Sequence, residues 1–274
     1  MNERIKITPE ASQADLKACC AALYQSDLAR LLLGETFHPG GGDLTLCLGE
    51  LLHLEPASQV LDVASGQGTS AILLAQQFGC QVQGIDYSPD MVQRANTRAQ
   101  ALGLDHLVSF QVGDAERLPF LDAAFDALLC ECAFCTFPDK ASAAAEFQRV
   151  LKSGGRLGLS DLTRSGDVPL ELQGLLSWIA CVADAQPVER YAQILSAAGF
   201  LIEAIEPHDE ALSELVSEVQ NKLLSAEILL HLKQIELPPT VNFTQAKTLA
   251  RAAKDSIRTG QFGYVVLIAT RPSC

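Results

Sequence analysis

The amino-acid sequence predicts an α/β fold built on a doubly wound sheet of parallel strands, and three observations lead to that prediction. Between residues 59 and 161, five strand-like apolar runs alternate with helical patterns. A turn of small residues, 64–68, joins the first run directly to a helix. Acidic residues stand at or near the ends of the runs, at Asp62, Asp86, Asp114, Glu131 and Asp161. Parallel strands bring their carboxyl ends to one edge of a sheet, where ligands bind.

The first unit consists of a strand over 59–63 and a helix over 69–78, with the small-residue turn between them. Such a turn lets the backbone approach a nucleotide-like ligand closely. The next strand, 81–86, ends in Asp86, whose carboxylate could accept hydrogen bonds from both hydroxyls of a ribose. The turn alone is weak support for such a ligand, and the turn followed by this acid is much stronger support.

The remaining elements follow from hydrophobic periodicity and from capping residues. Ser88 is expected to cap a helix that begins at Pro89 and ends near Leu102, just before Gly103. Further strands are expected over 107–112, 125–130, 156–161, 200–206 and 263–270. Further helices are expected over 8–33, 43–53, 139–151, 170–183, 188–198, 209–235 and 244–258. A turn is expected over 152–155, and a glycine-rich loop that contains His38 over 34–42.

We expect a single domain over residues 1–274, because no repeat, low-complexity tract or linker divides the chain. Its core is expected over 59–206 plus 260–271, with helical additions over 8–53 and 209–258. The second addition either covers the active site or mediates oligomerisation. The sequence leaves both possibilities open, and it leaves the oligomeric state open as well.

The composition, 48% hydrophobic and 19% charged, predicts a soluble globular protein with a sizeable core. A net charge of -13 argues against nucleic acid or an anionic membrane as a partner, because both require a basic surface. The apolar runs are too short for a transmembrane helix, and residues 1–6 lack the apolar region of a secretory signal. The predicted location is therefore the cytoplasm.

The chain contains nine cysteines, and an odd number in a cytoplasmic protein does not indicate a disulfide framework. Free cysteines are commonly small buried hydrophobes, and this is the interpretation we favour for Cys130 and Cys135. Cys132, which lies between them, is less easily assigned. A structural zinc site does not fit, because no second pair of cysteines or histidines stands at a suitable spacing.

Five segments in order resemble class I S-adenosylmethionine-dependent methyltransferases. They are residues 62–68 (Asp-Val-Ala-Ser-Gly-Gln-Gly), 84–91, 113–120, 125–126 and 149–155. The similarity covers residues 59–161 and continues more weakly to 206. It implies a Rossmann-like doubly wound seven-stranded sheet whose last strand is antiparallel, with N-terminal helices and a helical insertion before the last strand. One departure is Ala64, where many members have the first glycine of the loop.

The resemblance implies S-adenosyl-L-methionine as the cofactor and a set of residues that bind it. These are Asp62, Ala64, Ser65, Gly66, Asp86, Tyr87, Met91, Asp114, Ala115 and Glu131. The backbone of residues 64–66 would contact the methionine part, and Asp86 would hold the ribose. A dinucleotide-dependent dehydrogenase is the competing enzyme class. It would want a third glycine where this chain has Ala71 or Ile72.

At the adenine end, the resemblance implies that Tyr87 and Met91 pack beside the ring. Asp114 and the N–H of Ala115 would read the polar edge of the base. On its own, Asp114 is equally well interpreted as an acid that caps a turn. Its place in the ordered set of segments favours the binding role.

Two cysteines resemble metalloid-binding positions of arsenite methyltransferases. Cys132 opens a segment that ends in Pro-Asp-Lys, as a similar segment does in that family, and Cys181 matches a second thiol farther along the chain. Thiolates are the soft ligands that trivalent arsenic prefers. Members with three such cysteines carry another before the first strand, where this chain has residues 34–40. Cys47 is the nearest substitute.

Three hypotheses therefore stand. The leading one is a methyltransferase whose acceptor is arsenite, methylarsenite or a similar thiophile held by Cys132 and Cys181, either of which could equally be a packing residue. The second is a methyltransferase for a small organic O-, N- or C-acceptor with structural cysteines, in which His38 or Glu131 transfers a proton. A loop histidine without a special role is the ordinary alternative for His38. The third is a non-catalytic protein that binds the cofactor and serves as an interaction scaffold.

Overall fold

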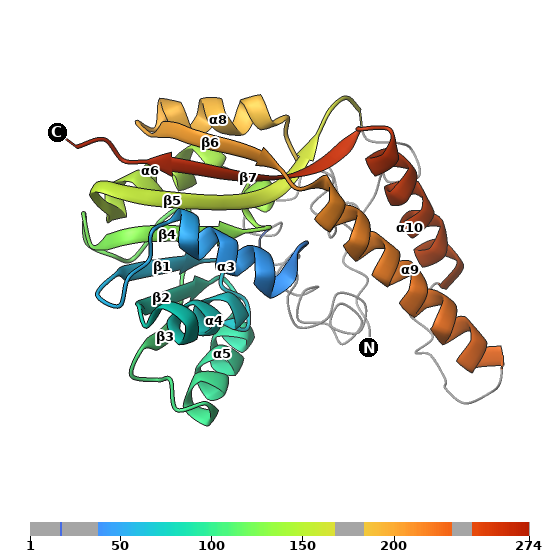
Figure 1. Cartoon of the computed structure of the whole chain (residues 1–274), viewed down its shortest axis with the longest axis horizontal. Helices are drawn as coiled ribbons and strands as arrows, with labels where there is room; N and C mark the ends of the chain where they lie inside the picture. Colours follow the sequence, from blue (N-terminus) through green and yellow to red (C-terminus); the bar gives the residue numbers. More distant parts are fainter. Residues whose placement is uncertain (1–16, 18–37, 168–183, 232–242, 274) are drawn as a thin grey trace.

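The computed structural model describes residues 17, 38–167, 184–231 and 243–273, and it is built around one seven-stranded sheet (Figure 1). The strand order is β3-β2-β1-β4-β5-β7-β6. The strands are β1 (Gln59–Val63), β2 (Gln81–Asp86), β3 (Val108–Val112), β4 (Phe125–Glu131), β5 (Leu151–Arg164), β6 (Leu201–Pro207) and β7 (Phe262–Thr270). All seven expected strands are present, and the Rossmann-like fold is confirmed.

The first five strands pair in parallel, and β7 runs antiparallel to both of its neighbours, β5 and β6. The central strands are almost continuously apolar, and Leu61, Leu128 and Leu157 are completely buried in them. Such runs are typical of parallel strands that are covered on both faces. The expectation of an antiparallel last strand is confirmed.

Helices cover both faces of the sheet. On one face lie α3 (Gly41–Leu51), α4 (Thr69–Phe78) and α5 (Pro89–Ala101), and on the other lie α6 (Lys140–Val150) and α8 (Val188–Ala197) (Figure 1). A short 3-10 turn, η1 (Phe134–Thr136), follows β4. Among the described residues, no helix has both the length and the apolar composition needed to cross a membrane.

The ends of α5 and α6 are determined by side-chain caps. The Ser88 hydroxyl accepts a hydrogen bond from the Met91 N–H at 3.1 Å, and Pro89 is the first residue of α5, as expected. Gly103 adopts a left-handed φ of 68° just after that helix. Asp139 caps α6 by accepting from the Ser142 N–H at 3.0 Å, and this bond lowers the pKa of its carboxyl.

The insertion between β6 and β7 is a helical hairpin of α9 (Asp209–His231) and α10 (Phe243–Arg258). The two helices pack on each other and extend away from the sheet, from the end of β6 and the start of β7 (Figure 1). At its base, Asp209 accepts a hydrogen bond from the Tyr264 N–H at 2.9 Å. Apart from residue 17, the expected helix over 8–33 lies outside the described residues, and so do the expected helix over 170–183 and residues 232–235 of the expected helix over 209–235.

The turn expected over 152–155 is an irregular part of β5 instead. Pairing between β4 and β5 shifts register after Phe125, and Gly154 has a φ of 76°. The Gly154 N–H donates to the Arg271 carbonyl at 2.9 Å, and the Arg271 N–H donates to the Gly155 carbonyl at 2.8 Å. The glycines therefore form a bulge that stays hydrogen-bonded, because the segment after β7 lies beside it.

Candidate active site

A cavity of about 180 Å³ lies at the carboxyl ends of β1, β2 and β4, where the strand order reverses between β1 and β4. Every candidate site residue except Cys181 lines it: His38, Asp62, Ala64, Ser65, Gly66, Asp86, Tyr87, Met91, Asp114, Ala115, Glu131 and Cys132. Cys181 lies outside the described residues. The acid Asp161, from the end of β5, does not line the cavity and is completely buried.

The loop after β1 is held in place by backbone contacts. Ala64 and Gly66 both adopt left-handed conformations, with φ values of 59° and 54°. The Ser65 N–H donates to the Ile85 carbonyl at 3.0 Å, which joins the loop to β2. The Phe110 ring from β3 lies where a Cβ on Gly68 would be, 2.5 Å away. The glycine thus allows the ring to pack against the underside of the loop.

Asp86 links this loop to the start of α5. Its carboxylate accepts hydrogen bonds from the N–H groups of Gly66 and Ser88, both at 2.8 Å. Burial raises the pKa of Asp86, and the two amide hydrogen bonds offset part of that rise. Each carboxylate oxygen keeps a second lone pair after accepting one bond, so the group can still accept hydrogen bonds from a ligand.

Asp62 is 3% exposed, and burial, together with the neighbouring Glu131 and Asp86, raises the pKa of its carboxyl well above the usual range. A hydrogen bond from the Ala71 N–H opposes that rise. The Oδ2 atom is buried and finds no hydrogen-bond partner among the described residues. A buried carboxylate oxygen without a partner is costly, so a cationic ligand at this position would be favourable.

Glu131, at the end of β4, is the centre of a polar network. Its carboxylate accepts from the Ser70 hydroxyl at 2.6 Å and from the Thr45 hydroxyl at 3.1 Å. The Nε2 atom of His38 lies 3.6 Å from Glu131 Oε2 and 3.4 Å from Thr45 Oγ1. The Nδ1 atom of His38 lies 3.1 Å from the Pro39 carbonyl, which can only accept. This contact places the proton on Nδ1 and leaves Nε2 as the basic nitrogen.

Lys17 lines the cavity beside Asp114, although no pattern in the sequence predicts this position. Its Nζ lies 2.7 Å from Asp114 Oδ2 and 2.5 Å from Glu116 Oε2. Burial alone would lower the pKa of Lys17, but the hydrogen bonds and charges of these two acids outweigh it and raise the pKa. The contact spans about a hundred residues of sequence, which is why no local pattern could predict it.

Cys132 is half-buried on the cavity wall and adopts an uncommon left-handed φ of 51°. Its N–H donates to the Ser160 carbonyl at 2.7 Å. Cys130 and Cys135 are completely buried in the core, which agrees with the packing role expected for them. Cys47 lies on α3 and does not line the cavity. Cys132 is therefore the only thiol that the described residues contribute to this site.

The fold and the position of the cavity define an α/β protein that binds a small ligand where the strand order reverses. The chain belongs to the family whose model is described as a methyltransferase domain, which matches residues 54–199, more than half of the sequence. It is an enzyme, an S-adenosylmethionine-dependent methyltransferase, as the resemblance implied. No cluster of three or more metal-binding side chains occurs within the described ranges.

Two curated relatives show how varied similar proteins are. The chain is 29% identical over 236 residues to Methyltransferase GfsG of Streptomyces halstedii, and the match covers 85% of this chain and 81% of that protein. It is 31% identical over 184 residues to an arsenite methyltransferase of Halobacterium salinarum. That match covers 65% of this chain and 46% of the relative, so the chain spans less than half of that protein.

Two solved structures share the fold. Phosphoethanolamine N-methyltransferase 2 of Haemonchus contortus, in complex with phosphomonomethylethanolamine and S-adenosylhomocysteine, has a TM-score of 0.76 at 19% identity. It covers 97% of this chain, and the match covers 59% of that one. The [4+2]-cyclase SpnF has a TM-score of 0.75 at 22% identity. The match covers 97% of this chain and 99% of SpnF. At these identities the likeness shows the fold and does not identify the acceptor.

Proposed function

We propose that S-adenosylmethionine binds in this cavity through the residues that the sequence indicated. The buried, unpartnered Oδ2 of Asp62 supports this placement, because the methionine part of the cofactor carries an ammonium group. Asp86 would hold the ribose, Tyr87 and Met91 would flank the adenine, and residues 64–66 would present backbone groups. The acids around the cavity suit a ligand with two positive charges. When bound, the cofactor supplies a methyl group already activated on a sulfonium.

The acceptor that the geometry supports best is a small organic molecule whose nucleophilic atom must lose a proton. The observation that carries this proposal is the buried contact between His38 and Glu131 on the cavity wall. His38 Nε2 would accept the proton of an acceptor hydroxyl as its oxygen forms a bond to the methyl carbon. The bond from that carbon to sulfur would break, and sulfur would keep the electron pair. Glu131 would stabilise the imidazolium that forms.

A methyl-transfer assay on a panel of hydroxyl, amine and carbon acceptors, with arsenite and methylarsenite included, tests this proposal. In the variant His38→Asn we expect kcat to fall by about 100-fold or more, because the amide cannot accept the proton. Cofactor affinity measured by calorimetry should stay close to that of the wild type.

His106→Asn is the matched control, because His106 is exposed and lies on the connection between α5 and β3. Its activity should equal that of the wild type. Full activity of His38→Asn on an organic acceptor would refute the proposed base. Loss of cofactor binding in the same variant would instead place His38 among the cofactor contacts.

A metalloid acceptor is the second candidate, and the position of Cys132 on the cavity wall favours it specifically. Cys181 would supply the second thiolate. The variants Cys132→Ser and Cys181→Ser should then lose methyl transfer to methylarsenite, and Cys47→Ser should retain it. If Cys132→Ser and Cys181→Ser both keep full activity on arsenicals, or if arsenicals are not methylated, the metalloid candidate is refuted and the organic acceptor remains. Family membership favours either enzyme over a non-catalytic scaffold protein.

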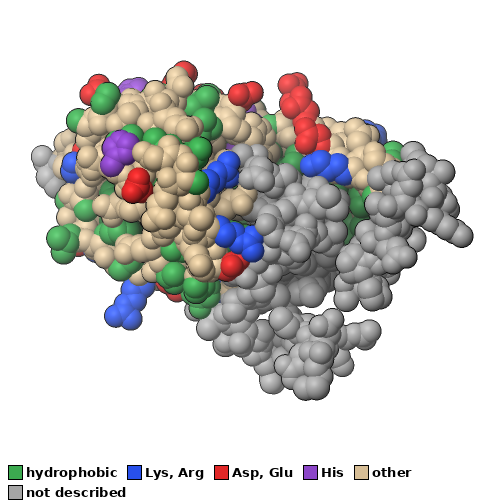
Figure 2. Space-filling view, turned by 90° about the horizontal axis from the view of Figure 1, so that it is seen from below, with side chains coloured by type: hydrophobic (Ala, Val, Ile, Leu, Met, Phe, Trp, Pro, Cys, Tyr) green, Lys and Arg blue, Asp and Glu red, His purple; other side chains and the backbone are tan. Residues whose placement is uncertain are grey.

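We further propose that residues 1–274 form one domain that acts in the cytoplasm on a small molecule or metalloid, without nucleic acid or membrane as a partner. The net charge of -13 supports the exclusion of polyanionic partners. On the face shown in Figure 2, the Lys and Arg side chains of the described residues are dispersed and form no continuous patch. A binding assay with DNA, RNA and anionic vesicles at low salt should show no affinity.

A further inference from the structure

The wall of the cavity that follows β4 is built on very little regular structure. Cys132, Ala133, Thr136 and Phe137 line the cavity from this wall. The only helical element within it is η1, a single 3-10 turn of three residues. Its backbone bonds are those from Thr136 N–H to the Ala133 carbonyl at 2.9 Å and from Phe137 N–H to the Phe134 carbonyl at 3.2 Å. A single turn has no stability of its own, so contacts from outside must hold it.

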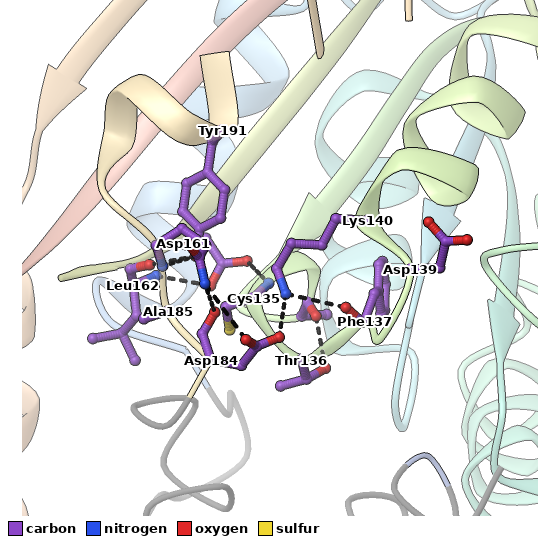
Figure 3. Close-up of polar contacts among 12 residues, drawn as sticks. Cys135, Thr136, Phe137, Asp139, Lys140, Asp161, Leu162, Asp184, Ala185 and Tyr191 are labelled. Carbon is purple, nitrogen blue, oxygen red and sulfur yellow. Dashed lines mark hydrogen bonds and ion pairs between the residues drawn. The ribbon is translucent and has the colours of Figure 1, made fainter. Parts of the chain in front are cut away.

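Asp161 of β5 provides the first outside contact (Figure 3). Its Oδ2 accepts a hydrogen bond from the Cys135 N–H, in the middle of η1, at 2.8 Å. Its Oδ1 accepts from the Leu162 N–H at 2.7 Å. The residue is completely buried. A buried carboxylate that accepts from two backbone amides is a strong and directional anchor.

Lys140 provides the second contact (Figure 3). Its Nζ donates to the Phe137 carbonyl at 3.0 Å and to Asp184 Oδ2 at 2.5 Å. Lys140 is 8% exposed and is the first residue of α6. Burial of an ammonium group is costly, and a positive charge at a helix N-terminus is unfavourable. Both features oppose folding, so the two contacts of Nζ explain why a lysine occupies this position.

We propose that Lys140, held by Asp184 and assisted by Asp161, positions the wall of residues 132–137 against the methyl acceptor. Asp184 lies in the connection between β5 and α8, so the ion pair joins the chain after β4 to the chain after β5. The three side chains do not line the cavity, and they act through the backbone that does. The inference rests on the proposed function only in assuming that the acceptor lies against this wall.

The variant Lys140→Met keeps the length of the side chain and removes its charge and donors. In a methyl-transfer assay with the best acceptor of the panel, we expect KM for the acceptor to rise by about tenfold or more. The dissociation constant of S-adenosylmethionine, measured by calorimetry, should change less than twofold. Asp184→Asn, which keeps the lysine and weakens its partner, should shift KM in the same direction by less. The double variant should be no worse than Lys140→Met alone.

A second measurement does not need an acceptor. The rate at which iodoacetamide alkylates Cys132, determined by peptide mass spectrometry, reports the conformation of the wall, and Cys47 on α3 is an internal reference. We expect Lys140→Met to change the Cys132 rate by about threefold or more and to leave the Cys47 rate unchanged, because access controls thiol reactivity. Lys152→Met is the matched control. It breaks the half-exposed pair of Lys152 with Asp126, 2.7 Å apart, where β4 and β5 begin.

An unchanged Cys132 rate in Lys140→Met would overturn the proposal, and so would an equal change in Lys152→Met. A parallel rise at Cys132 and Cys47 would mean general destabilisation, and the proposal would also fail. If no organic acceptor in the panel is methylated, the proposed acceptor class fails, but the alkylation rates still decide the role of Lys140. The two failures are therefore distinguishable.

Discussion

The two halves of the cavity are held together in different ways. The half formed by the ends of β1, β2 and β3 is organised by short-range contacts between neighbouring strands, such as the bond from Gly66 to Asp86. The half that follows β4 is organised by side chains from β5, from α6 and from the connection before α8. The first arrangement is encoded mainly in local motifs, with the pair of Lys17 and Asp114 as an exception, and the second is encoded in long-range pairs.

The largest expected effect belongs to the first half. Asp86→Ala removes the acceptor for two backbone N–H groups and the proposed contact with the ribose. We expect the affinity for S-adenosylmethionine, measured by calorimetry, to fall by about 100-fold. The alkylation rate of Cys132 should not change if the two halves are independent. Asp90→Ala is the control, because the Asp90 side chain is 45% exposed and pairs with Arg94 on the surface of α5. If Asp86→Ala changes both the cofactor affinity and the alkylation rate of Cys132, the two halves of the cavity are not independent.

The next effect belongs to the second half. Asp161→Asn offers one acceptor oxygen to two buried N–H groups, so one of them loses its partner. We expect the free energy of unfolding, measured with urea, to fall by about 1–3 kcal/mol. Cofactor affinity should stay within twofold of the wild type. Asp122→Asn, at a carboxylate that is 78% exposed and paired with Arg149, should leave stability unchanged. If cofactor affinity falls as well, the second half is not independent of the first.

Asp62→Asn should separate stability from binding. Because the pKa of Asp62 is raised in the folded protein, its ionisation opposes folding. That cost is absent below the unfolded-state pKa of about 3.9 and grows as pH rises toward the folded-state pKa. At pH 8 the ligand-free variant should therefore be more stable than the wild type, on the order of 1 kcal/mol, and the gap should narrow toward pH 5. Affinity for S-adenosylmethionine should fall.

Urea unfolding at the two pH values, with and without cofactor, measures both quantities for Asp62→Asn. A variant that is less stable than the wild type at pH 8 would contradict the inference that ionisation of Asp62 opposes folding. A variant with unchanged cofactor affinity would contradict its proposed contact with the ammonium group.

The smallest effect concerns Ala64, which has a left-handed φ of 59°. Glycine adopts this conformation without the steric penalty of a Cβ but loses more backbone entropy on folding. We expect Ala64→Gly to raise the free energy of unfolding by about 0.5 kcal/mol, which is seen as a slightly higher melting temperature. The cofactor affinity should stay within twofold of the wild type. Ala123→Gly is the control, because Ala123 has a φ of 54° and does not line the cavity. Its free energy of unfolding should change by a similar amount. A large change in cofactor affinity would show that the alanine has a role in binding.

The ten residues that the sequence named for cofactor binding stand at or near strand ends, and all ten line the cavity. Their individual contacts with the cofactor stay a prediction. The start of α5 was predictable because Ser88 marks it as a cap, whereas the cap at Asp139 was not predicted. Long-range partners were not, because neither Lys17 with Asp114 nor Lys140 with Asp184 leaves a periodic or local signal.

The place of β7 in the sheet has a consequence for the order of folding. β7 lies between β5 and β6, and residues 262–270 pair with residues synthesised about a hundred positions earlier. On the ribosome, β6 emerges well before the strand that attaches it to the sheet. The parallel unit of β1 to β5 can form while synthesis continues, whereas β6 must wait for β7. During that interval β5 is an open edge, and the sheet is complete only when β7 pairs with both β5 and β6.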